Sequence, residues 1–254
     1  MPNSSCNSRI QNVHQKIFML VCAFFSFANP RKWGVISEIY SATRFDAAVT
    51  ISYSQCAEDI SLLHFLSGQK NGFYIDVGAH DPNRFSVTRL LYYRGWKGIN
   101  IDANPDIERK FKKFRPNDQF INCAVGNKDS YEFFQFEESA ISTVNNEWKE
   151  KFLSENNKIV NTLNVPGLSL RRIIDSSSRK SIDLLNIDVE GADFEVIRSA
   201  EFETLPKSNF PKWISVETPI GVNNVINLEM IRYLQGFNYE IMSVLPMSTI
   251  LKLN

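Results

Sequence analysis

The 254-residue sequence lacks several features that would place it in a common class of protein. It carries no net charge, because 28 lysine and arginine residues balance 28 aspartate and glutamate residues, whereas nucleic-acid-binding proteins usually have a basic excess. Its four cysteines, Cys6, Cys22, Cys56 and Cys123, are scattered and form no C-x-x-C pair. This spacing argues against a disulfide framework and a zinc site. We therefore expect free thiols in a reducing compartment and no nucleic-acid partner.

A hydrophobic run long enough to span a membrane is also missing from the N-terminal region. Residues 17–28 form an apolar run of 12 residues, well short of the ~20 that cross a bilayer. The length and the preceding positive charges suit a signal peptide, but no A-x-A cleavage site follows. We expect residues 1–50 to be an N-terminal segment with a short apolar helix that is retained. This helix either packs on the catalytic domain or contacts a membrane surface peripherally.

The glycine pattern of dinucleotide-binding proteins is absent as well, which narrows the choice of ligand. Residues 73–77 are almost all aromatic or β-branched, as in a strand buried on both faces of a parallel sheet. Gly78 follows, but the rest of G-x-G-x-x-G does not, so a pyrophosphate would lack its backbone cradle. A second short strand, residues 98–102, ends in Asp102, where Rossmann-like folds bind ribose hydroxyls. An adenosine without phosphates but with an amino-acid tail fits both features, which predicts S-adenosylmethionine.

The pattern along the chain predicts an α/β domain over residues 51–254, with a seven-stranded, mostly parallel Rossmann-like sheet flanked by helices. Further strands are expected at residues 119–125, 182–188, 213–217, 239–244 and 249–253, with a shorter one at 131–136. The last two should form an antiparallel hairpin. Helices are expected at residues 52–66, 85–94, 106–114, 169–176, 193–200 and 228–235. Residues 137–166 show little periodicity, which favours a functional lid without a clear element.

The predicted fourth strand ends in two acidic residues, Asp188 and Glu190. Methyl transfer to a hydroxyl requires that the hydroxyl is aligned and loses its proton. Either carboxylate, or the imidazole of His80 beside the first strand, could be the base. The carboxylates would also permit a magnesium ion without requiring one, and we predict the metal-free route. In the structural alternatives, Glu190 caps the following helix and His80 is a satisfied polar residue.

These motifs, in this order, resemble those of the FkbM-type S-adenosylmethionine-dependent methyltransferases. The resemblance rests on S-Q-x-x-E-D at residues 54–59, F-Y-I-D-V-G-A-H-D-P at 73–82, R-G-W-K-G-I-N-I-D at 94–102 and I-D-V-E-G-A-D at 187–193. Ser86, Thr88, Arg115-Pro116, Asp118 and residues 122–125 extend it. It implies the class I methyltransferase fold, in which the last strand is antiparallel. It also implies methylation of hydroxyl groups on sugars, polyketides or other small natural products.

The resemblance also implies which residues hold the cofactor. It puts Asp76, Gly78 and Ala79 near the methionine end, Asp102 on the ribose and Asn104 beside the adenosine. Asn122, Cys123 and Ala124 would flank the adenine. Many methyltransferases carry a glutamate where this chain has Asp102, which is one methylene shorter. We expect Gly78→Val to fill the space of the ligand and leave the chain folded.

The sequence therefore predicts an enzyme that methylates a hydroxyl of a carbohydrate or a glycosylated small molecule with S-adenosylmethionine. Glu217 could bind acceptor hydroxyls, and Trp148 and Phe152 could stack on a sugar ring. Two alternatives stay open: an NAD(P)-dependent oxidoreductase, disfavoured by the missing G-x-G-x-x-G, and a non-catalytic binding protein of the same fold. Because the cofactor is made in the cytoplasm, we expect a cytoplasmic protein, with membrane association through residues 17–28 as an alternative.

Overall fold

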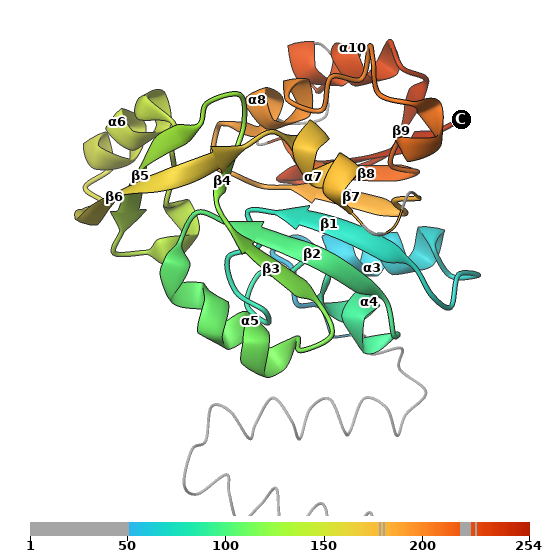
Figure 1. Cartoon of the computed structure of the whole chain (residues 1–254), viewed down its shortest axis with the longest axis horizontal. Helices are drawn as coiled ribbons and strands as arrows, with labels where there is room; N and C mark the ends of the chain where they lie inside the picture. The colour runs from blue at the N-terminus through green and yellow to red at the C-terminus, as the bar shows by residue number, and fades with distance from the viewer. Residues whose placement is uncertain (1–50, 178, 180, 219–224, 227) are drawn as a thin grey trace, which may run out of the picture. The chain divides into compact units, whose positions relative to one another are not determined.

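A seven-stranded sheet forms the centre of the structure (Figure 1), and its strands follow the order β3-β2-β1-β7-β8-β10-β9. Its strands are β1 (Phe73–Val77), β2 (Lys97–Asp102), β3 (Gln119–Asn122), β7 (Leu184–Ile187), β8 (Trp213–Glu217), β9 (Tyr239–Val244) and β10 (Ser248–Leu253). The strands from β3 to β8 run parallel, whereas β10 is antiparallel to β8 and β9. The predicted α/β class, with its antiparallel finish, is confirmed.

The computed structural model describes residues 51–177, 179, 181–218, 225–226 and 228–254. Ser52–Asn254 form one compact unit. The apolar helix expected at residues 17–28 lies outside the described residues. In the part of the chain that is described, no helix has both the length and the apolar character needed to cross a membrane.

Helices cover both faces of the sheet, which explains why β1 is apolar on both sides. All five residues of β1 are buried, and successive side chains of a strand point to opposite faces. Phe73, Ile75 and Val77 contribute to the core beside α7 (Leu170–Ser176), α8 (Asp193–Arg198) and α10 (Glu229–Gln235). Tyr74 packs in the core on the other face, with α3 (Glu58–Phe65) and α4 (Arg89–Tyr93).

A second, three-stranded sheet was not predicted. It has the order β4-β6-β5 and consists of β4 (Ala124–Val125), β5 (Ser130–Phe136) and β6 (Ile159–Leu168). The predicted strand 119–125 therefore breaks at Cys123 into β3 and β4. The expectation of no clear element in residues 137–166 is wrong, because they contain η2 (Ser139–Ile141), α6 (Asn146–Ser154) and most of β6. Much of β6 is exposed, so its polar sequence lacks the apolar signal of a buried strand.

Two predicted helices begin later than expected. Helix α3 begins at Glu58 instead of residue 52, and α4 at Arg89 instead of residue 85. Ala57 and Phe85 have positive φ angles of 63° and 57°, in the left-handed region that a right-handed helix cannot contain. After β2, η1 (Pro105–Ile107) leads into α5 (Glu108–Phe114). This nearly matches the predicted helix at 106–114.

The strand register aligns the carboxyl ends of β1, β2, β7 and β8. Val77 is paired with Ile101 of β2 and with Ile187 of β7, and Ile187 is paired with Val216 of β8. The polar residues that follow these positions therefore share one edge of the sheet. Ligands of parallel α/β sheets bind outside this edge.

Candidate active site

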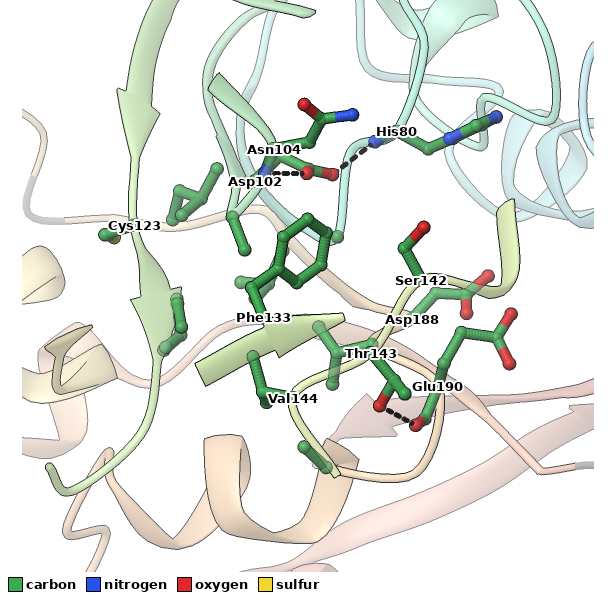
Figure 2. Close-up of a pocket in the computed structure, with 18 of the residues that line it drawn as sticks. His80, Asp102, Asn104, Cys123, Phe133, Ser142, Thr143, Val144, Asp188 and Glu190 are labelled. Atoms are coloured by element: carbon green, nitrogen blue, oxygen red, sulfur yellow. Dashed lines mark hydrogen bonds between the residues drawn. The ribbon is translucent and has the colours of Figure 1, made fainter. Parts of the chain in front are cut away.

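A cavity lies at this edge, between the ends of β1, β2 and β7 and the segment that precedes α6 (Figure 2). It encloses about 630 Å³ of space between atoms, part of which is open solvent. Its lining includes Gly78, His80, Asp102, Asp188 and Glu190. The fold thus brings together both predicted carboxylates, the predicted histidine and the predicted ribose-binding residue.

Asp102 is held in one orientation by the backbone. Its Oδ2 accepts a hydrogen bond from the N–H of His80 and its Oδ1 one from the N–H of Asn104, both at 2.8 Å. Burial raises the pKa of Asp102 to about 6. Each carboxylate oxygen can accept a further hydrogen bond. Asp102 is therefore a fixed acceptor on the cavity wall, suited to a pair of hydroxyl groups.

The wall next to Asp102 is mostly apolar. Ile101, Cys123 and Ala124 line it, and Phe133 of β5 contributes an aromatic ring (Figure 2). Burial raises the pKa of the Cys123 thiol to about 12, so the thiol is neutral at physiological pH. Such a wall suits a flat heteroaromatic ring. Phe133 was missed from the sequence because nothing local places β5 over the end of β2.

The two asparagines predicted near the adenosine have different positions. Asn104 lines the cavity, and its Oδ1 accepts hydrogen bonds from Asp106 N–H and from Gln135 Nε2. Asn122 is not part of the lining. Its Nδ2 instead donates to the carbonyls of Asp102 and Ala103. Asn122 therefore positions the Asp102 loop, and its predicted place beside the adenine stays a prediction.

Gly78 lies where the ends of β1 and β7 are too close to leave room for a side chain. Its φ is +79°, and a Cβ there would lie 1.7 Å from the carbonyl oxygen of Asp188. A side chain would push apart the ends of β1 and β7, so the expectation that Gly78→Val leaves the fold intact is wrong. Ala79 packs with Ile107 and Phe111 and is not part of the cavity lining.

Asp76 does not reach the cavity either. Its buried carboxylate accepts hydrogen bonds from Thr88 Oγ1 at 2.6 Å and from Asn186 Nδ2 at 2.9 Å. Burial raises its pKa. These contacts hold the Asp76 side chain inside the sheet, and its predicted place near the methionine end of the cofactor stays a prediction.

His80 lines the cavity but lies apart from Asp188 and Glu190 (Figure 2). Its φ is 49°, and its ring stacks on Phe85 with centroids 6.4 Å apart. Burial is the largest cause that lowers its pKa, which favours the neutral imidazole. Its Nε2 is buried and has no hydrogen-bond partner among the residues that the structure describes, which does not fit the satisfied polar residue of the structural alternative.

Asp188 and Glu190 lie on the opposite side of the cavity, and Glu217, which does not line it, lies close to both. One oxygen each from Asp188, Glu190 and Glu217 lies within 4.8 Å of the others. Burial, followed by the charge of Glu190, raises the pKa of Asp188 well above its usual value. Burial and the charge of Asp193 raise the pKa of Glu190 to about 7. Burial and the charge of Asp188 raise the pKa of Glu217 to about 10.

Glu190 lies in a turn with an uncommon backbone conformation, which sets the direction of its side chain. Glu190 and Gly191 have φ angles of 53° and 93°, and a left-handed conformation is uncommon for a glutamate. Thr143 Oγ1 donates to the carbonyl of Glu190, and Asn145 Nδ2 donates to that of Gly191, both at 2.8 Å. The N-cap of α8 is Ala192, so Glu190 is not the cap residue of that helix.

A second hollow adjoins the cavity on the side of Glu217. Trp148, Gly191, Glu217 and Thr218 contribute to its lining. A Cβ on Gly191 would lie 2.1 Å from the Trp148 ring, so the glycine allows the indole to lie against the turn. Phe152 is buried with Phe134 and Phe136. Phe152 therefore packs α6 against β5, and its ring is not available to stack on a sugar ring as predicted.

The family model described as "Methyltransferase FkbM domain" matches residues 76–241. This match covers more than half of the chain and includes every lining residue named above. The chain belongs to the FkbM methyltransferase family. The predicted resemblance is confirmed, and the protein is a methyltransferase of the S-adenosylmethionine-dependent type. No curated protein matched the chain in a separate search.

Several solved methyltransferase structures are similar to this FkbM-family chain at low identity. The human methyltransferase 10 domain containing protein is 11% identical, with a TM-score of 0.42 over 90% of this chain and 98% of that one. An O-methyltransferase from Bacillus cereus in complex with SAH is 12% identical, with a TM-score of 0.38 over 92% and 97%. A TehB-like SAM-dependent methyltransferase from Corynebacterium glutamicum is 9% identical, with a TM-score of 0.38 over 89% and 100%. At these values the similarity concerns the fold alone.

Several FkbM motif residues support the site from inside the protein. The buried Arg115 side chain donates to the carbonyl of Pro82 and to the hydroxyls of Ser86 and Thr88. Its Nη1 lies 3.9 Å from a carboxylate oxygen of Asp118. This network ties the loop between β1 and α4, which begins beside His80, to the segment after α5.

Proposed function

We propose that this FkbM-family protein transfers a methyl group from S-adenosylmethionine to a hydroxyl of a carbohydrate or a glycosylated small molecule. The observation that carries the cofactor assignment is Asp102, a carboxylate fixed by two backbone N–H groups next to an apolar wall. Ribose hydroxyls would donate to Asp102, and the adenine would lie against Cys123 and Phe133. The cofactor supplies a methyl group on a positively charged sulfur.

The second hollow supports a sugar-like acceptor. The indole of Trp148 offers an apolar surface to the C–H face of a sugar ring, and Glu217 offers an acceptor for hydroxyl groups. In the reaction, the acceptor oxygen bonds to the methyl carbon while the carbon–sulfur bond breaks and its electron pair goes to sulfur. The hydroxyl proton leaves at the same time. Asp188, Glu190 and His80 are the groups of the cavity that could accept it.

A nicotinamide cofactor fits this cavity less well. The turn after β1 has one glycine, and the Ala79 side chain that follows is packed against Ile107 and Phe111. The close backbone approach that a pyrophosphate needs is therefore not available in the usual form. Selective binding of S-adenosylmethionine would also distinguish the methyltransferase hypothesis from that of a binding protein without a cofactor.

Calorimetric titrations with S-adenosylmethionine and with NADH test this proposal. We expect binding of S-adenosylmethionine alone, and a loss of about 1.5–3 kcal/mol in Asp102→Ala, the range for hydrogen bonds to a charged group. Asp106→Ala is a matched control, because Asp106 is exposed nearby and does not line the cavity. Unchanged affinity in Asp102→Ala, or a preference for NADH, would contradict the assignment.

Mass spectrometry of glycans and glycolipids from the host, with and without the gene, tests the acceptor class. We expect O-methylated sugars to be lost with the gene. If the methyl groups lost belong to proteins or nucleic acids instead, the carbohydrate assignment is wrong.

We also propose that the protein works in the cytoplasm, where its cofactor is made, and that it acts on a small-molecule or glycan acceptor. Residues 17–28 would then be retained and make at most a peripheral contact with a membrane. Intact-mass measurement tests retention, because cleavage of a signal peptide would remove roughly the first 28 residues. Recovery in the membrane fraction after a carbonate wash would contradict a peripheral contact.

A further inference from the structure

We propose that Asp188, Glu190 and Glu217 together bind a divalent cation that prefers oxygen ligands, namely Mg²⁺ or Mn²⁺. One carboxylate oxygen of each residue lies within 4.8 Å of those of the other two. An Mg–O bond is about 2.1 Å long, so adjacent ligands of an octahedral ion are about 3.0 Å apart and opposite ligands about 4.2 Å apart. The three side chains would therefore have to move together by about 1–2 Å to bind the ion.

The sheet brings these three residues together from distant parts of the sequence. Asp188 follows β7 directly and Glu217 ends β8, and the pairing of Ile187 with Val216 places both at the same level. The strained turn held by Thr143 brings the third carboxylate, Glu190, to them. The sequence showed the pair Asp188 and Glu190, but only the register of β7 and β8 adds Glu217.

Glu217 indicates a missing ligand independently of the cluster. It is only 7% exposed, yet its carboxylate has no hydrogen bond or ion pair with any residue that the structure describes. Buried polar groups are almost always paired, and the carboxyl group of Glu217 lacks such a partner. Asp193 provides the contrast, because its oxygens accept hydrogen bonds from Val189 N–H and Gly191 N–H. The carboxylate of Asp193 is thus already hydrogen-bonded to the backbone, whereas that of Glu217 points at the other two carboxylates.

The charges around the cluster are mainly negative. Asp193, Glu58 and Asp76 all raise the pKa of Asp188 through their charges. Lys151 lowers the pKa of Glu190 and Glu217, but it forms no ion pair with either within the described part of the chain. Its Nζ instead lies 4.3 Å from the centre of the Trp148 ring. A divalent cation would supply the missing positive charge, and a set of carboxylate oxygens suits Mg²⁺ and Mn²⁺.

The catalytic role of the cation rests on the proposed function, although its binding does not. Asp188 and Glu190 line the cavity of Asp102, and Glu217 lines the hollow of Trp148. A cation among them would therefore sit between cofactor and acceptor, coordinate the acceptor hydroxyl and lower its pKa. The proton would pass to solvent. This replaces the metal-free route that the Asp188–Glu190 pair alone favoured.

Titration of the full chain with Mn²⁺ alone, followed by electron paramagnetic resonance of the free ion, tests the site. We expect one bound Mn²⁺ per chain and competition by Mg²⁺. In Glu217→Gln the affinity should fall by about ten-fold or more, because carboxylate sites depend on the number of charged ligands. Glutamine keeps the shape of the side chain and removes the carboxylate ligand, and circular dichroism verifies folding. Glu229→Gln is the matched control, because Glu229 lines the same hollow but lies outside the cluster.

Absence of Mn²⁺ binding to the wild type, or equal binding by Glu217→Gln and wild type, would overturn the proposal. Calorimetry with S-adenosylmethionine in the presence of a chelator separates this failure from that of the proposed function. Cofactor binding without any Mn²⁺ site would reject the cation and leave the methyl donor. A Mn²⁺ site lost in Glu217→Gln, without cofactor binding, would support the cation and reject the methyl donor.

Discussion

Gly78 controls how closely β1 and β7 approach at the edge of the active-site cavity. We predict that Gly78→Ala lowers the free energy of unfolding by more than about 2 kcal/mol, because the left-handed backbone alone costs an alanine roughly 1–2 kcal/mol. The clash of the new Cβ with the carbonyl of Asp188 adds to this. Chemical denaturation measures the change. Gly68→Ala is the control, because a Cβ there meets no atom within 4 Å. Equal stability of the two variants would contradict this role.

Asp102 makes cofactor binding depend on pH. Its pKa is raised by burial to about 6, so the carboxylate is ionised above pH 6 and protonated below it. Because ribose hydroxyls donate to the ionised form, we predict that affinity for S-adenosylmethionine is highest above pH 6 and falls as the pH drops through that value. Calorimetry from pH 5 to 8 measures this. In Asp102→Asn this step should disappear, and a step that persists would assign the titration to another group.

At the scale of elements, the buried guanidinium of Arg115 fixes the loop between β1 and α4. It is within hydrogen-bond distance of the Pro82 carbonyl and the Thr88 hydroxyl, and Asp118 lies beside it. We predict that Arg115→Met destabilises the protein by about 3–5 kcal/mol, because it leaves a buried carboxylate without its charge partner. Urea denaturation measures this loss. Arg94→Met, at an exposed position, should change stability by less than about 0.5 kcal/mol.

At the scale of the whole molecule, the described cavity is built within the unit Ser52–Asn254. Its lining residues run from Val77 to Ala192. We predict that a shortened chain beginning at Ser52 stays folded and binds S-adenosylmethionine with unchanged affinity. Circular dichroism and calorimetry on the two chain lengths check this. Weaker binding by the shortened chain would show that residues 1–51 contribute to the site.

The sequence by itself determined the central sheet and the family of this protein. The strands β1, β2, β7 and β8 are buried and therefore carry apolar runs that stand out locally. Asp102 and Asp188 end or follow such runs, so their positions at one edge of the sheet could be predicted. Gly78 could be predicted as part of the turn, but not its contact with Asp188, which depends on which strands are neighbours.

Only the tertiary structure decided which side chains meet at the site. Phe133 reaches the cavity through a second sheet whose strand β6 is too exposed to give a buried-strand pattern. Asp76 turned out to be bound inside the protein by Thr88 and Asn186. Glu217 joins Asp188 and Glu190 through the register of β7 and β8 and a turn with positive φ. Pairing between distant strands and backbone strain arise from packing of the whole chain, so no local pattern of residues encodes them.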